Sequence, residues 1–205
     1  GIETQKELAE ASGLSVGTVN SVIRDAVDRK WVDQTTSPYR LTDQGIKALA
    51  PYKVDNAIIM AAGLSTRFAP ISYEKPKGVL VVRGEVLVER QIRQLHEAGI
   101  HDITLVVGYK KEEFFYLADK LDVDIVVNLS RNNNGTLYKV RDRLKNTYIC
   151  SSDNYFTSNV FEPYVYEAYY PGVYVEGPTN EWCMQTGNHE RIVKVTYGLV
   201  DAWTM

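Results

Sequence analysis

The stretch AIIMAAGLSTRFAPISYEKPKGVL, residues 57–80, decides the fold class that we predict for this chain. It begins with an apolar run, which is typical of a buried strand, and continues into a loop of small residues, prolines and positive charges. In a parallel α/β sheet, the loop after the first strand is the usual place for a phosphate group. The loop has neither Walker nor Rossmann glycine spacing, so its ligand needs a separate argument.

Apolar strands and helical segments alternate on both sides of this loop. The patterns predict strands at 56–60, 103–107, 123–127 and 148–152, and helices at 87–98, 111–121 and 137–144. Such alternation is typical of a parallel sheet with helices on its faces. We therefore predict an α/β, Rossmann-like domain over residues 54–205, with a mainly parallel central sheet.

Residues 1–53 have a different pattern, and we predict a small separate domain there. Thr4 and Glu7 have capping-box spacing at the start of one helix, Gly13 ends that helix, and Ser15 begins a second. Two short apolar segments around a polar turn follow, as in a small hairpin. The stretch TQKELAEASGLSVGTVNSVIRDAVDRKWV resembles the winged helix-turn-helix of bacterial regulators.

This resemblance implies DNA contact through the second helix, over Ser15–Lys30, with Arg24 on a phosphate. Residues 1–54 carry seven Lys and Arg residues and seven Asp and Glu residues, so the basic footprint of a DNA-binding surface is missing. A protein-contact role or a spacer role for this domain therefore stays open beside DNA recognition.

The composition of the chain excludes several classes of protein. A formal net charge of -3 excludes wholesale nucleic-acid binding. No apolar run approaches the roughly 18 residues of a membrane-spanning helix, and the first residues do not resemble a signal peptide, so we expect no membrane contact and a cytoplasmic location. Cys150 and Cys183 lack metal-ligand spacing, and we expect both to be buried free thiols.

The loop after the first strand can bind a triphosphate. Ala61, Ala62 and Gly63 are small enough for their backbone amides to approach a ligand closely. Arg67 and Lys77 bring positive charge to oxygens that gain negative charge when pyrophosphate leaves. The alternative is a surface loop with ordinary solvated charges.

The Ala-Ala-Gly sequence, Arg67 and the Lys-Pro-Lys sequence that ends at Lys77 resemble the nucleotidyltransferases that build activated sugars and alcohols. The resemblance implies transfer of a nucleoside monophosphate to a substrate phosphate, with Lys77 and Arg67 as catalytic residues. Ser65 stands where that family has its second motif glycine. Asn133 and Asn134 match a family pair near the nucleotide.

Such chemistry needs Mg²⁺ to bridge phosphate oxygens. Asp153 directly follows the predicted strand 148–152, in the position of the family's metal-binding aspartate. A turn aspartate before Asn154 is the alternative. The family has a second aspartate on a later strand, and Asp201 is the one late candidate in an apolar context. We expect this chain to stop before that second ligand, as a C-terminally truncated domain.

The segments SSDNYF, 151–156, and NEW, 180–182, resemble the bacterial choline-phosphate cytidylyltransferases. The resemblance implies that Trp182 faces the quaternary ammonium of choline, a contact of about 0.5–2 kcal/mol. Tyr155 is a second substrate-binding candidate, and Tyr169 and Tyr170 are weaker ones. The alternative for most of these aromatic residues is ordinary packing.

The expected reaction follows from this resemblance. It is transfer of CMP from CTP to phosphocholine, which gives CDP-choline and pyrophosphate. The choice of CTP over UTP or GTP rests on the resemblance alone. Two alternatives stay open, namely a nucleotidyltransferase for a sugar phosphate and a DNA-binding transcription regulator whose α/β domain senses a nucleotide.

Overall fold

The computed structural model describes residues 4–36, 38–63, 69–128 and 133–205. The chain forms two compact units, residues 1–165 and residues 166–205. The domain boundary predicted near residue 53 lies within the first unit, and it stays a prediction.

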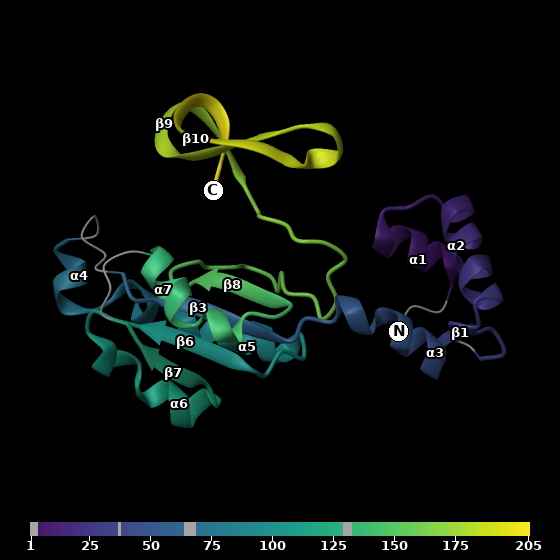
Figure 1. Ribbon diagram of the computed structural model, residues 1–205, viewed down its shortest axis with the longest axis horizontal. Coiled ribbons are helices and arrows are strands. Elements are labelled where there is room, and N and C mark those ends of the chain that lie inside the picture. Colours follow the sequence, from purple (N-terminus) through teal and green to yellow (C-terminus); the bar gives the residue numbers. More distant parts are fainter. Residues whose placement is uncertain (1–3, 37, 64–68, 129–132) are drawn as a thin grey trace. The chain divides into compact units, whose positions relative to one another are not determined.

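The N-terminal part contains the elements that its sequence predicts (Figure 1). Two helices precede a short antiparallel hairpin, and a third helix follows it. Their bounds are α1 Gln5–Ser12, α2 Val16–Asp28, β1 Val32–Asp33, β2 Arg40–Leu41 and α3 Asp43–Leu49. The short 3-10 helix η1, Ala50–Tyr52, then leads toward the sheet.

The predicted end of α1 and the predicted starts of α1 and α2 are confirmed. The side chain of Thr4 accepts a hydrogen bond from the Glu7 N–H at 3.2 Å, while Glu7 accepts one from the Thr4 N–H, which completes the capping box. Gly13 ends α1 in the left-handed region, with φ 67°. The Ser15 hydroxyl accepts from the Thr18 N–H at 3.1 Å and starts α2.

The central sheet confirms the predicted fold class. Its strand order is β7-β6-β3-β8, and every neighbouring pair is parallel. The strand bounds are β3 Asn56–Ala61, β6 Ile103–Val107, β7 Asp124–Val127 and β8 Thr147–Ser151. Each strand lies within one residue of its predicted range at either end.

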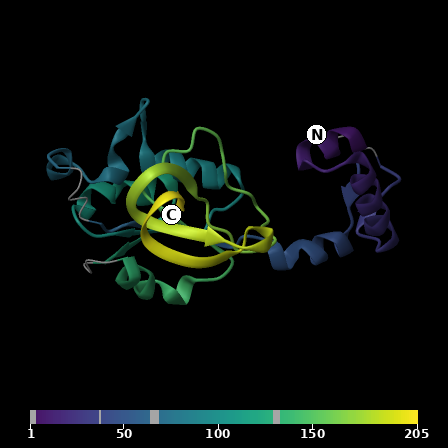
Figure 2. The ribbon, with the colours of Figure 1, turned by 90° about the horizontal axis from the view of Figure 1, so that it is seen from above.

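Helices cover both faces of this sheet (Figure 1; Figure 2). On one face, Ile59 of β3 packs in a core with Ile92 of α5, which spans Leu87–Glu97. The short helix α6, Tyr116–Leu121, adds Leu117 to the same core. Alternate strand residues point to the opposite face, where Ile58 and Val106 pack with Val140, which follows helix α7, Asn133–Lys139. The layers therefore follow from the period of two along each strand.

Two predicted helices differ in detail from those observed. The segment predicted as one helix at 111–121 is a 3-10 turn, η4 Lys111–Phe114, followed by α6. The helix predicted at 137–144 starts earlier, as α7 Asn133–Lys139, and ends in the 3-10 turn η5, Arg141–Arg143. Helix α7 begins with two asparagines and a glycine, which are weak helix formers, so the sequence pattern did not predict its first turn. A buried hydrogen bond of 3.0 Å from Asn128 Nδ2 to Thr136 Oγ1 fixes that turn to the end of β7.

Short elements connect β3 to α5. They are α4 Ile71–Glu74, the 3-10 helix η3 Lys77–Val79, and the antiparallel pair β4 Val81–Val82 and β5 Glu85–Val86. This connection carries most of the motif that the sequence analysis singled out. It replaces the direct strand-to-helix turn of a Rossmann phosphate loop.

The second unit is built on one long antiparallel pair, β9 Val173–Thr186 and β10 Ile192–Thr204. The 3-10 turn η6, Asn188–Glu190, joins the two strands. The pair bends strongly. Its curvature brings Trp203, near the end of β10, into register with both Tyr174 and Met184 of β9. Its register shifts at several positions, which is typical of a bulged and curved ribbon.

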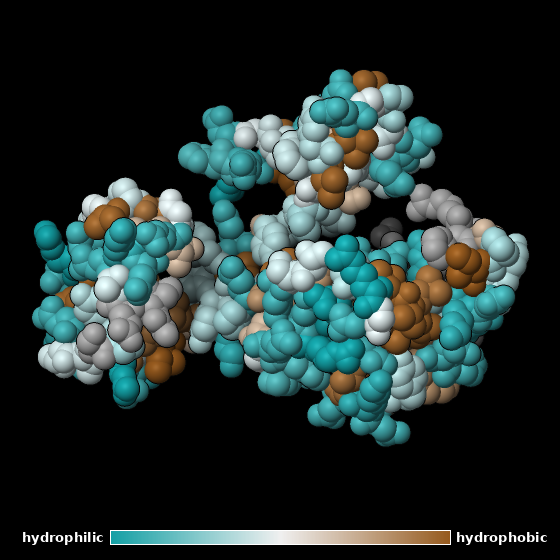
Figure 3. Space-filling model, turned by 180° about the vertical axis from the view of Figure 1, so that it is seen from behind, coloured by the Kyte–Doolittle hydropathy of each residue, from teal (hydrophilic) through white to brown (hydrophobic). Residues whose placement is uncertain are grey.

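Both cysteines, Cys150 and Cys183, are buried and free, as predicted. Among the described residues, no helix is long and apolar enough to cross a bilayer. Hydrophilic residues cover most of the face in Figure 3, with small hydrophobic patches between them.

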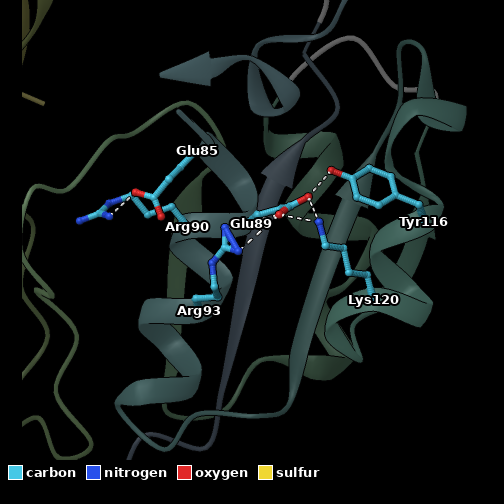
Figure 4. Close-up of polar contacts among 6 residues, drawn as sticks. All are labelled: Glu85, Glu89, Arg90, Arg93, Tyr116 and Lys120. Carbon is cyan, nitrogen blue, oxygen red and sulfur yellow. Dashed lines mark hydrogen bonds and ion pairs between the residues drawn. The ribbon is translucent and has the colours of Figure 1, made fainter. Parts of the chain in front are cut away.

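A buried carboxylate joins α5 to α6 (Figure 4). Glu89 of α5 accepts hydrogen bonds of 2.8 Å from the Tyr116 hydroxyl and from Lys120 Nζ, and Arg93 lies 3.4 Å from its other oxygen. Burial raises the pKa of Glu89, but its hydrogen bonds from Lys120 and Tyr116 and the two cations lower that pKa by more. Burial and the bond to Glu89 raise the pKa of Tyr116 above its ordinary value. Glu89 therefore stays ionised while Tyr116 stays neutral, and the contacts of Glu89 hold the two helices together.

Candidate active site

Lys77 and Asp153 meet at the carboxyl edge of the sheet. Lys77 Nζ lies 3.1 Å from Asp153 Oδ2, and their side chains are 31% and 34% exposed. Lys77 begins the 3-10 helix η3, and Asp153 lies just beyond the end of β8. The structure thus brings together the two groups to which the sequence assigned phosphate binding and metal binding.

Gly78 allows this approach, although the sequence analysis did not single it out. A Cβ added at Gly78 would lie 3.0 Å from the Ser152 side chain and 3.1 Å from the ring of Phe114. The backbone of η3 therefore packs against the chain directly before Asp153, in a space that no larger residue fits without displacement. The position of the glycine, immediately after Lys77, was the available signal.

Two neighbours hold the Asp153 carboxylate in its ionised form. Burial raises the pKa of Asp153, but a 2.5 Å hydrogen bond from the Ser151 hydroxyl to Oδ1 and the bond and charge of Lys77 outweigh that effect. The net result is a pKa below its ordinary value. Sequence reasoning missed Ser151, which is the last residue of β8 and precedes the aspartate by two positions. The side chain is thus an ionised, partly exposed carboxylate, which could bind a cation.

The start of the predicted triphosphate loop lies at the same edge. Ala61 ends β3, and Ala62 and Gly63 follow it. A Cβ added at Gly108, just after β6, would lie 2.8 Å from the Ala62 carbonyl oxygen and 2.7 Å from that of Asn128. The ends of three parallel strands are therefore packed closely together. Apart from its chain neighbours, no described atom lies within 4 Å of a Cβ built on Gly63.

Several predicted residues lie outside the part of the chain that the structure describes. Arg67 and Ser65 belong to the undescribed segment 64–68. Asn133 and Asn134 are the first residues of α7, but their side chains are not described. The roles assigned to these four residues stay predictions.

Lys110 fastens the middle of the loop region to the sheet. Its ammonium donates to the carbonyl oxygens of Tyr73 at 2.6 Å and Glu74 at 2.7 Å. These carbonyls end helix α4, where a cation is favourable. Lys110 follows β6 and has a left-handed backbone, with φ 50°. It therefore ties the segment before Lys77 to the neighbouring strand, and sequence reasoning did not find it.

Tyr155 lies two residues beyond Asp153 and is half-buried. The guanidinium of Arg90 is 4.9 Å from the centroid of its ring. The structure thus gives this predicted substrate-binding residue a cationic partner, Arg90, that the sequence did not reveal.

The remaining aromatic candidates belong to the second unit. Trp182 lies on β9, is 55% exposed, and packs edge-to-face with Tyr197 at 5.5 Å between centroids. Tyr169 and Tyr170 are exposed and precede β9. Their assigned contact with a substrate stays a prediction.

Asp201 has a local partner. Its carboxylate accepts a 2.6 Å hydrogen bond from the Gly177 N–H across the strand pair. The described residues contain no group of three or more His, Cys, Asp and Glu side chains arranged to hold a metal ion. A divalent cation at Asp153 would therefore take most of its other ligands from water and from phosphate oxygens.

The parallel sheet with a carboxylate and a cation at its carboxyl edge is the arrangement of a nucleotide-binding α/β enzyme. The chain belongs to the MobA-like NTP transferase domain family, whose family model matches residues 57–169.

Two curated relatives are similar over most of the α/β part. The chain is 41% identical over 139 residues to a choline-phosphate cytidylyltransferase of Streptococcus pneumoniae, which covers 66% of this chain. It is 35% identical over 157 residues to a 2-aminoethylphosphonate cytidylyltransferase of Lancefieldella rimae, which covers 73% of this chain. The chain spans 61% and 64% of the length of these relatives.

Solved structures agree with this family membership. The CTP:phosphocholine cytidylyltransferase from Streptococcus pneumoniae superposes with a TM-score of 0.69 at 38% identity, over 73% of this chain and 67% of that one. The inositol-1-phosphate CTP transferase from T. maritima has a TM-score of 0.53 at 16% identity, over 75% of this chain and 69% of that one. The second similarity concerns the fold alone.

Proposed function

We propose that the chain is the nucleotidyl-transferring part of a CTP:phosphocholine cytidylyltransferase, which makes CDP-choline and pyrophosphate. The observation that carries the proposal is the contact between Lys77 and Asp153 at the end of a parallel sheet. It joins a cation suited to phosphate oxygens with a carboxylate suited to Mg²⁺. The similarity to cytidylyltransferases supports CTP as the nucleotide.

The residues of the chain would act by positioning and by charge. The backbone around Ala62 and Gly63 would bind the triphosphate, and Lys77 would stabilise the negative charge that develops on the departing pyrophosphate. The phosphate of phosphocholine would attack the α-phosphorus in line, so that its oxygen–phosphorus bond forms as the bond to pyrophosphate breaks. This phosphate is already ionised, so no general base is required.

The ionised, partly exposed carboxylate of Asp153 fits a divalent cation. Mg²⁺ bound there would neutralise charge on the triphosphate oxygens. Ser151, which donates to the other carboxylate oxygen, would keep the ligand oriented.

The acceptor is the least constrained part of the proposal. Trp182 would supply an aromatic face for the quaternary ammonium of choline, which cannot donate a hydrogen bond. The similarity to a 2-aminoethylphosphonate cytidylyltransferase favours that phosphonate as a second candidate acceptor. Both compounds join a small cationic group to a phosphorus oxyanion, so the same Lys77 and Asp153 would serve either one.

DNA contact through α2 is not part of this proposal. The Ser15 hydroxyl, on the face predicted to read DNA, lies 2.8 Å from the Thr18 hydroxyl and already caps the helix. Arg29, near the end of that helix, pairs with Asp25 at 2.9 Å and lies over the Trp31 ring. The winged-helix assignment, its DNA contact and a cytoplasmic location stay predictions.

Pyrophosphate release by the full chain tests the proposed function. CTP, UTP and GTP are each offered with Mg²⁺ and with phosphocholine, 2-aminoethylphosphonate or glucose 1-phosphate. We expect the fastest release with CTP and phosphocholine. Preference for glucose 1-phosphate would identify a sugar nucleotidyltransferase. Absence of release with every pair, together with salt-sensitive binding of one DNA site, would identify a regulator.

A further inference from the structure

We propose that Arg90 is a positioning residue for the acceptor side of this site. It fixes residues 155–157, the segment that begins two positions after Asp153, in one conformation. The inference rests on the proposed function, because it concerns how that same site holds its second substrate.

Arg90 uses its guanidinium in three directions. Its Nε donates to the Phe156 carbonyl at 2.8 Å and its Nη2 to the Thr157 carbonyl at 2.9 Å, while Nη1 pairs with Glu85 at 2.5 Å. The side chain is 21% exposed. Figure 4 shows Arg90 paired with Glu85, separately from the contacts that Glu89 makes. The ion pair with Glu85 holds the guanidinium in place and offsets part of its charge.

The same guanidinium sets the orientation of Tyr155. It lies 4.9 Å from the ring centroid, a distance typical of a cation–π contact. One face of this ring is therefore already taken by a cation. A ligand can use only the opposite face or the hydroxyl, so Arg90 determines which side of Tyr155 is presented to the acceptor.

Helix α5 holds the chain on both sides of Asp153. Gln91 Nε2 donates to the Ser151 carbonyl at 3.2 Å, before the aspartate. Arg90 contacts the Phe156 carbonyl after it, and Gln94 Nε2 reaches the same oxygen at 3.3 Å. The carboxylate is thus held between two points on one helix. Loss of the Arg90 contacts would leave the acceptor side held by the longer Gln94 bond alone, while the strand side stays in place.

Lysine cannot replace arginine here. A lysine has one ammonium group, whereas the planar guanidinium donates to separate carbonyls and stacks on a ring at once. We expect Arg90→Lys to raise the KM for phosphocholine roughly tenfold, which corresponds to about 1.4 kcal/mol. The KM for CTP should stay within about twofold, because the contacts on the strand side remain.

The matched control is Arg93→Lys, the same substitution on the same helix. The hydrogen bonds and the ion pair described for Arg93 are with Glu89. We expect this variant to leave both KM values unchanged. An equal rise in the KM for CTP and for phosphocholine in Arg90→Lys, or no rise in either, would overturn the proposal.

A double-mutant cycle covers the case in which Arg90→Lys does not fold, as judged by thermal unfolding. Glu85→Gln weakens the support of Arg90 while it keeps the arginine, and Tyr155→Leu removes the ring. We expect each to raise the KM for phosphocholine and their effects to be less than additive. Additive effects, or none, would contradict the proposal. If the unchanged chain releases no pyrophosphate with any acceptor, the proposed function fails, and this inference fails with it.

Discussion

Lys77 Nζ and Asp153 Oδ2 lie 3.1 Å apart, although 76 positions separate the two residues in the sequence. The ammonium of Lys77 thus occupies one side of the carboxylate to which we assign the divalent cation. The Lys77 ammonium and the divalent cation would repel each other at this carboxylate. The negative charge of a bound triphosphate would hold the two cations close together. Nucleotide and metal are therefore expected to bind as coupled ligands.

Removal of Lys77 should abolish transfer while the fold remains. We expect Lys77→Met to lower kcat by about 10²–10³, because a charge that stabilises the departing pyrophosphate is lost. The melting temperature should change little, since a pair that is about a third exposed contributes about 1 kcal/mol or less. Lys47→Met, an exposed lysine on α3, is the control and should keep normal pyrophosphate release. Normal turnover in Lys77→Met would contradict the assignment.

The same substitution should strengthen metal binding when no nucleotide is present. With the ammonium removed, Asp153 no longer has a positive charge beside it that repels a divalent cation. We expect Mn²⁺ to bind Lys77→Met at least about tenfold more tightly than the unchanged chain, in a titration followed by electron paramagnetic resonance. Asp153→Asn should remove this site in both backgrounds. Equal Mn²⁺ affinity with and without Lys77 would refute the coupling.

Gly78 should tolerate no larger residue. A Cβ there would lie 3.0 Å from the Ser152 side chain, so we expect Gly78→Ala to destabilise the chain by about 1–3 kcal/mol and to lower kcat by moving Lys77. Urea unfolding and pyrophosphate release measure the two effects. Adding Ser152→Gly should restore part of both losses, because it removes the atoms that the alanine meets. Unchanged stability in Gly78→Ala would show that the contact is not as close as described.

Glu89 should make stability depend on pH on the acid side. Its pKa in the folded chain lies below the ordinary value of 4.5, so its stabilisation is complete above pH 4.5 and is lost as the pH falls through the lower, folded value. Compared with Glu89→Gln, the unchanged chain should be about 2 kcal/mol more stable at pH 7, with a constant difference from pH 6 to 8. Denaturant unfolding at several pH values measures this difference, which should shrink below pH 4.5.

The control for this series is Glu112→Gln, an exposed glutamate outside the cluster. It should follow the unchanged chain at every pH. If the difference in unfolding free energy between the unchanged chain and Glu89→Gln stayed constant down to pH 3, the partners of Glu89 would not lower its pKa.

Trp182 should distinguish the candidate acceptors. If its ring holds a quaternary ammonium, Trp182→Leu should raise the KM for phosphocholine by about 2–30-fold, which corresponds to about 0.5–2 kcal/mol. The KM for CTP should not change. Trp203→Leu, on the neighbouring strand, is the control. Equal effects of the two substitutions would indicate a structural role for Trp182.

Local signals in the sequence determined the fold class and the ends of several elements. The apolar runs of β3 and β6, the capping box at Thr4 and the glycine at position 13 all act within a few residues, where spacing and backbone preference suffice. The motif from Ala61 to Lys77 likewise pointed to the carboxyl edge of the sheet, because that edge follows from the strand order of a parallel fold.

The tertiary structure alone decided how the candidate site is held. The close approach of Gly78 to Ser152, the bonds of Lys110 to the end of α4, and the contacts of Arg90 with residues 155–157 join segments that no sequence period relates. The start of α7 also depends on a tertiary contact. The buried hydrogen bond from Asn128 to Thr136 stabilises a first turn whose residues have a weak helix preference. Contacts between distant segments depend on packing in three dimensions, and neither spacing nor composition records that packing.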